Sequence, residues 1–139
     1  MKLIFLFVFL LLALPALRAE SHLADIQRSH IEANVPSPEV FAELLKHDLL
    51  EFFRKDIAKV ATTAKYRLLR DGPTQSGVSY PKYYLWVTLE NGSTKIVEGV
   101  ARVAAIEKKR FDVTHFMSKE QIQSQPEQVR SVFPPALVA

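Results

Sequence analysis

The chain has 139 residues, with 18 Lys and Arg against 15 Asp and Glu, a formal net charge of +3 and no cysteine. Without cysteine, disulfides and thiolate metal sites are excluded, so the fold must be stabilised by buried apolar surface. Lys2 and Arg18 belong to the leader described next. Without them, 16 basic residues face 15 acidic ones, a balance that gives no reason to expect a nucleic-acid partner.

The first 19 residues have the pattern of a secretory signal peptide. Lys2 precedes an unbroken apolar run over residues 3–14, which is shorter than a transmembrane helix, and a proline and small residues follow it. We expect cleavage near Ala19, or alternatively after Ala16, to leave a mature chain of about 120 residues, the size of one domain. The protein is therefore expected to be exported, either periplasmic or secreted, with no membrane span once the leader is removed.

Helical signals begin twice after the leader. Residues 20–36 place apolar side chains at helical spacing, which suits either a short leading helix or a mobile segment. A stronger start follows, because Ser37 can cap a helix, Pro38 is tolerated in a first turn and Glu39 suits the helix dipole. Apolar residues three and four positions apart then form one broad stripe that ends near residues 55–56. They are Val40, Phe41, Leu44, Leu45, Leu49, Phe52 and Phe53.

Four segments rich in β-branched and aromatic residues follow, separated by turn residues rather than by helices. They are residues 59–70, 80–90, 94–106 and 110–117. They predict an α+β domain over residues 37–117, in which one long amphipathic N-terminal helix packs on a four-stranded antiparallel meander sheet. Ser118 and Gln121 have the pattern of a capping box, and Pro126 can open a further helical turn. Residues 118–139 are therefore expected to hold a short C-terminal helix and a tail.

The turn between the second and third strands can close in two ways. A two-residue Asn91-Gly92 turn pairs Leu85 with Glu98, whereas a three-residue loop with a left-handed Gly92 and a bulge pairs Leu85 with Val97. We favour the second closure because it gives the sheet one clean apolar face.

The opposite face of the sheet, called the second face below, mixes apolar and charged residues under that closure. Its members are Lys82, Tyr84, Trp86, Ile96, Glu98, Val100 and Arg102. This composition is typical of a partner surface, a dimer interface or a face covered by the terminal segments. We take Tyr84, Trp86, Glu98 and Arg102 as candidate binding residues, with Tyr84 opposite Glu98.

The loop over residues 71–79 is more polar than a tight hairpin requires. Gly72, Pro73 and Gly77 account for its turns. The remaining polar side chains are of the kind that loops use for contacts, and we take them as further candidates. These are Thr74, Gln75 and Ser76.

No motif predicts a metal site or a catalytic centre. The four histidines do not pair at metal-binding spacing, and neither a nucleophile elbow nor a phosphate loop occurs. Asp48 is the one acid within the apolar stripe. It is either a candidate general base in a pocket or a structural acceptor for a tyrosine, such as Tyr66 or Tyr83, or for an arginine at the sheet edge.

One helix followed by a four-stranded meander resembles the cystatin-like architecture and is similar to the nuclear transport factor 2-like cone, over residues 37–117. Cystatin inhibitors insert a Gln-x-Val-x-Gly loop and a Pro-Trp loop into cysteine proteases. Here the corresponding stretches read QSGVS at residues 75–79 and ENGS at residues 90–93, so the resemblance does not imply protease inhibition. The likeness to the cone-shaped family implies a pocket between helix and sheet in which Asp48 could act.

The sequence predicts a small exported, non-enzymatic domain that binds a protein or envelope ligand through the second face and the 71–79 loop, or that self-associates through this face. No cofactor or metal ion is expected. The alternative is an enzyme or small-molecule carrier of the nuclear transport factor 2-like type that uses Asp48.

Overall fold

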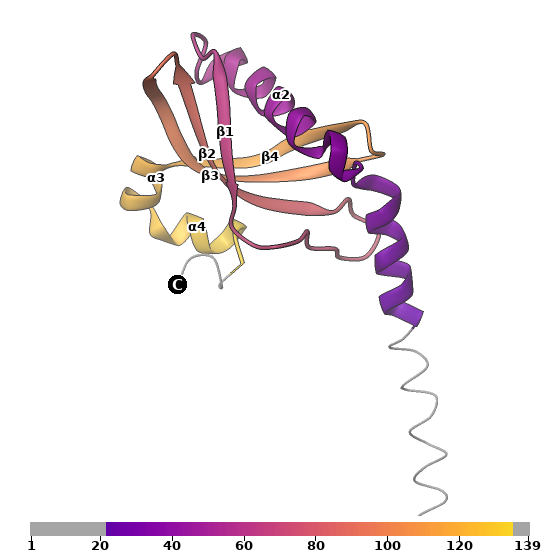
Figure 1. Ribbon diagram of the computed structural model, residues 1–139. Helices are drawn as coiled ribbons and strands as arrows, with labels where there is room; N and C mark the ends of the chain where they lie inside the picture. The colour runs from indigo at the N-terminus through magenta and orange to yellow at the C-terminus, as the bar shows by residue number, and fades with distance from the viewer. Residues whose placement is uncertain (1–21, 135–139) are drawn as a thin grey trace, which may run out of the picture.

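The structure is a computed structural model that describes residues 22–134, and the expected signal peptide and the last five residues lie outside this range. Helical residues 22–34 are followed by α2, a four-stranded antiparallel sheet and two short helices (Figure 1). The sheet has the order β1-β2-β3-β4, so consecutive strands are neighbours. The elements are α2 Pro38–Asp56, β1 Thr63–Leu68, β2 Lys82–Asn91, β3 Thr94–Ile106, β4 Arg110–Ser118, α3 Lys119–Ser124 and α4 Pro126–Val132.

Two helical segments rather than one long helix precede the sheet. Residues 22–34 are helical, and α2 begins at Pro38 as expected. Ser37 has the extended backbone of an N-cap, but its side chain makes no capping hydrogen bond, so that part of the expectation is wrong. The apolar stripe is also narrower than predicted, because Val40 and Phe52 are exposed.

The first face of the sheet packs against α2 (Figure 1). Leu45, Leu49 and Phe53 of α2 are buried there with alternate residues of β2 and β3. The Phe41 ring lies between Tyr83 and Phe111, with centroids 5.1 Å from each in edge-on geometry. The residues of β2 and β3 in this core are Tyr83, Leu85, Val87, Leu89, Ala101, Val103 and Ala105.

The second face is partly covered by α3 and α4 (Figure 1). α3 begins with the expected capping box, since the Ser118 side chain accepts from the Gln121 backbone and the Gln121 side chain accepts from the Ser118 backbone. Val129 and Phe133 then pack on Tyr84 in a second buried cluster. The chain is thus layered as helix, sheet and helices.

The β2–β3 register differs from the one predicted. Gly92 is left-handed (φ 61°) and a bulge is present, but the bulge lies between Leu89 and Glu90, and Asn91 pairs with Thr94. Leu85 therefore faces Ala101 instead of Val97, and Tyr84 faces Arg102 instead of Glu98. Both corrections are shifts of four positions. An even shift keeps each side chain on its own face, so the division into two faces is correct for β2 and for residues 97–103 of β3. Ile96 was expected on the second face, but it is the extra residue at the bulge and packs against the first core.

Candidate functional site

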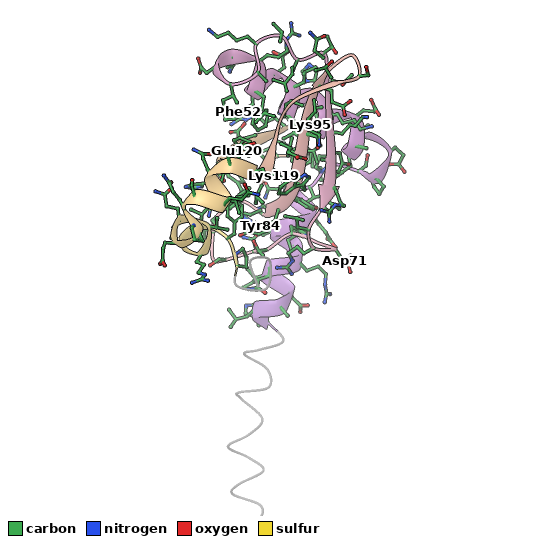
Figure 2. The ribbon with its side chains drawn as sticks, turned by 90° about the vertical axis from the view of Figure 1, so that its left-hand side faces the viewer. Phe52, Asp71, Tyr84, Lys95, Lys119 and Glu120 are labelled. Atoms are coloured by element: carbon green, nitrogen blue, oxygen red, sulfur yellow. The ribbon has the colours of Figure 1, made fainter. Side chains whose placement is uncertain are left out.

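The second face is the candidate site, and Figure 2 views the molecule from the side on which α3 and α4 lie, with Tyr84, Lys95 and Lys119 labelled. Tyr84 is only 6% exposed, because the Phe133 ring packs edge-on against it with centroids 6.0 Å apart. Tyr84 was predicted as a contact residue, but its side chain is a buried support for α4. The C-terminal segment therefore covers this part of the second face, which was one of the alternatives considered from the sequence.

Trp86 stays outside both buried clusters and is half-buried. On β2 it lies between Arg67 of β1 and Val100 of β3. Its indole Nε1 donates to Oε2 of Glu98 over 3.2 Å. This bond fixes the orientation of the ring and leaves part of it open to a partner.

Glu98 connects Trp86 to two lysines. Its Oε2 lies 3.2 Å from Nζ of Lys95, and its Oε1 lies 3.6 Å from Nζ of Lys119 at the start of α3. Burial alone would raise the pKa of Glu98, but the hydrogen bonds from Lys95 and Trp86 and the charges of Lys95 and Lys119 hold it below its ordinary value. Glu98 is thus an ionised anchor for Trp86, and its diagonal partner across the strands is Trp86 rather than Tyr84.

Arg102 lies on β3 opposite His115 of β4. Its Nε donates to Oγ1 of Thr114 over 2.9 Å, and its Nη2 lies 2.6 Å from Nδ1 of His115. Burial, and then the charge of Arg102, lower the pKa of His115. Arg102 was a predicted site residue, whereas His115 was not.

His115 was missed because β4 changes its alternation. A register shift between Arg102 and Val103 places Val113 opposite Val103 and His115 opposite Arg102. The sequence carries a signal for this shift. Phe111 and Phe116 both belong to the first core, but they are five positions apart, a spacing that a regular strand would place on opposite faces.

Lys82 lies at the start of β2, on the second face. Its Nζ donates to the backbone oxygen of Tyr80 over 2.6 Å. Burial, and then the charge of Arg102, lower its pKa. Lys82 was placed on this face by its parity but was not singled out as a site residue.

The 71–79 loop reaches the same edge of the sheet. Thr74 and Lys82 exchange backbone hydrogen bonds of 2.8 and 2.9 Å, so Thr74 lies beside the second face. Gln75 instead donates within the loop, to the oxygens of Gly77 and Ser79 over 3.1 and 2.5 Å. Ser76 is exposed, and its backbone oxygen accepts from Oγ of Ser79. Of the three loop candidates, Thr74 is the one that joins the edge of the face.

Asp48 has a structural partner. Its Oδ2 accepts a 2.7 Å hydrogen bond from the backbone N–H of Phe111, and its side chain is 17% exposed. Its Oδ1 lies 3.1 Å from Nδ1 of His47. The partners are thus a main-chain amide and a neighbouring imidazole, and not Tyr66, Tyr83 or an arginine, as the sequence suggested. The carboxylate thereby attaches α2 to the start of β4.

An open groove of ≈ 330 Å³ lies beside Asp48, between α2 and β4. Its other charged side chains have both signs, and its apolar ones include Phe52 and Val113. The charged side chains are Glu51, Lys55, Arg110 and Asp112. Arg110 and Asp112 pair with each other at 3.2 Å. The groove is open to solvent and does not enclose Asp48 in a pocket.

Within residues 22–134 no three His, Cys, Asp or Glu side chains lie where they could share a metal ion. None of the helices in this range is long and apolar enough to span a membrane. Comparisons of the chain with protein-family models, with curated proteins and with solved structures give no match.

Proposed function

We propose that this chain is a small exported, non-enzymatic domain that binds a protein or envelope ligand through the part of the second face that α3 and α4 leave open. The proposed contact residues are Trp86 and Arg102, with Thr74 at the edge of the loop. We also propose that its architecture is a cystatin-like roll, because α2 is followed by a four-stranded antiparallel meander with consecutive strands as neighbours.

The observation that carries this proposal is the position of Trp86. Partly exposed aromatic rings with a fixed orientation are effective contact residues because binding buries apolar area at a low cost in side-chain entropy. Glu98 holds the indole, and the C-terminal helices bury Tyr84 next to it but leave Trp86 outside their cluster. The exposed Arg67 on the neighbouring strand adds a charged rim.

The test compares two aromatic side chains on opposite layers of the molecule, Trp86 on the second face and Phe52 on α2. The mature chain, immobilised, is incubated with an envelope extract, as wild type, Trp86→Ala and Phe52→Ala. Phe52 is 36% exposed on α2 and provides a matched control. We expect a component that wild type and Phe52→Ala retain and Trp86→Ala loses, with unfolding curves that show all three folded.

The same experiment separates the alternatives. A component lost with Phe52→Ala and kept with Trp86→Ala would overturn the proposal and favour a ligand in the Asp48 groove, the carrier or enzyme alternative. A sedimentation mass of twice the mature chain that Trp86→Ala halves would identify the partner as a second copy. Because Trp86 is the chain's single tryptophan, its fluorescence provides an independent signal for a purified ligand.

A further inference from the structure

A second feature of this face is a row of three basic side chains from three neighbouring strands. Lys82 starts β2, Arg102 lies on β3 and His115 lies on β4. Arg102 and His115 are direct cross-strand partners, and Lys82 lies one diagonal step away, since its neighbour Tyr84 is the partner of Arg102. All three therefore point to the same side of the sheet.

The hydrogen bonds within this row leave only donors facing outward. An arginine can only donate, so Nδ1 of His115 accepts from Arg102 and the proton of the neutral ring lies on Nε2. Arg102 uses Nε for Thr114 and Nη2 for His115, so its Nη1 has no partner among the described residues. Together with Nζ of Lys82, the row presents ammonium, guanidinium and imidazole N–H groups and no acceptor.

The carboxylates near this row are engaged elsewhere. Asp112 on β4 pairs with Arg110, and Glu98 pairs with Lys95 and Lys119. In the part of the chain that the structure describes, no carboxylate forms an ion pair with any of the three basic groups; the acids of α3 and α4, Glu120 and Glu127, form none with them either.

This arrangement costs free energy unless an anion joins it. Burial, and then the charge of Arg102, lower the pKa values of both Lys82 and His115, which means that Arg102 repels the protonated form of each. A tetrahedral oxyanion offers several acceptors and a negative charge, and guanidinium and ammonium groups are its usual ligands in proteins.

We propose that Lys82, Arg102 and His115 form a binding site for a phosphate-type tetrahedral oxyanion carried by the ligand of this face. The inference rests on the proposed function in that it names the chemistry of the same ligand, and the site can be tested without knowing the whole ligand.

The experiment follows the imidazole signals of the mature protein by NMR during pH titrations with inorganic phosphate, and with sodium chloride at the same ionic strength. A bound anion stabilises the protonated imidazole, so we expect phosphate to raise the pKa of His115 above the value that chloride gives. Equal His115 titrations in phosphate and in chloride would overturn the site, unless the vesicle arm below shows binding that depends on Arg102.

Charge-neutral variants provide the matched comparison. Arg102→Gln should weaken phosphate binding about tenfold or more, as expected for loss of charge-assisted hydrogen bonds. Arg54→Gln removes the same charge from the exposed face of α2 and should change the affinity for phosphate little. Equal effects of the two variants would show a general charge effect and contradict the site. If Arg102→Gln fails to fold, Lys82→Gln replaces it as the test variant. Arg102→Lys keeps the charge and should recover part of the affinity for phosphate.

Vesicles of phosphatidylcholine with and without phosphatidylglycerol distinguish the source of the phosphate. Binding to the anionic vesicles alone, lost in Arg102→Gln, supports the site with a lipid headgroup as ligand; binding of inorganic phosphate supports it with a soluble one. Failure in both arms rejects the oxyanion site, even if Trp86→Ala still loses its captured component. Conversely, phosphate binding without any component that depends on Trp86 would keep the site and reject the proposed function.

Discussion

The two faces of the sheet use the same strands in different ways. On the first face, Leu85 and Val87 of β2 are fully buried against α2. On the second, the intervening Tyr84 lies under α4 while Trp86 is held by a carboxylate and stays partly exposed. Packing alone accounts for the first face. The second contains ionised groups that α3 and α4 do not seal, and this open part is the surface that we propose for binding.

The largest expected effect comes from opening the first face. Phe53→Ala should lower the free energy of unfolding by about 3–5 kcal/mol, because the ring is fully buried and also packs on Phe116 with centroids 4.7 Å apart. Urea unfolding followed by circular dichroism measures the change. The neighbouring Phe52→Ala is the control and should cost less than about 1 kcal/mol, since Phe52 is 36% exposed. Similar losses of stability for the two variants would contradict the placement of Phe53 in the buried stripe and of Phe52 outside it.

A smaller effect is expected from the cover of the second face. Phe133→Ala should cost about 2–4 kcal/mol, because the ring is buried but its cluster contains fewer residues than the first core. We also expect Tyr84 to become exposed, which quenching of tyrosine fluorescence in a Trp86→Phe background can detect. If Phe133→Ala left both stability and the exposure of Tyr84 unchanged, α4 would not be a fixed layer of the fold.

Asp48 belongs with the first face if its role is structural. Asp48→Ala leaves the N–H of Phe111 without its acceptor and should cost about 1–3 kcal/mol. Asp48→Asn keeps an oxygen at that place and should recover much of the loss, again measured by urea unfolding. Equal stability of all three proteins, with uptake or turnover of a small molecule lost in Asp48→Asn, would instead support the pocket alternative.

Alternation made the two faces predictable from the sequence, because side chains on a strand alternate with a period of two and β2 is apolar at its odd positions. The pairing partners were not predictable. The turn residues Asn91 and Gly92 permit several closures, and shifts by even numbers preserve the faces, so Leu85 could be matched with Val97 as well as with its true partner Ala101.

The remaining differences arise from groups that a sequence pattern does not report. Asp48 is satisfied by a main-chain amide, and every residue except proline carries one. Val129 and Phe133 have helical spacing in the sequence, but nothing in that spacing indicates that they cover Tyr84 and not Trp86. His115 reaches the second face through a strand irregularity; the spacing of Phe111 and Phe116 indicates that an irregularity exists, but it does not indicate which residue between them is displaced.

The smallest effect concerns the pH dependence of the second face. Burial and the charge of Arg102 hold the pKa of His115 below its ordinary value of about 6.5, so the unfolded chain binds this proton more readily than the folded one. Stability should therefore fall as the pH drops from about 6.5 to the lower folded pKa and then become constant with respect to this group. The charges that face it are Arg102 and, beyond it on β2, Lys82, with Asp112 and Arg110 further along β4.

Unfolding curves of wild type and His115→Gln, measured across about pH 5 to 8, isolate the contribution of His115. The free energy of unfolding of the variant should rise relative to that of wild type as the pH is lowered. NMR should place the pKa of His115 in wild type below its ordinary value. Arg102→Gln should shift it back upward, because one of its two causes is removed. A His115 that titrates at or above the ordinary value in the ligand-free protein would show that an anion, or a carboxylate of the chain, already balances Arg102, and the contrast between a neutral, packed first face and a charged, open second face would be lost.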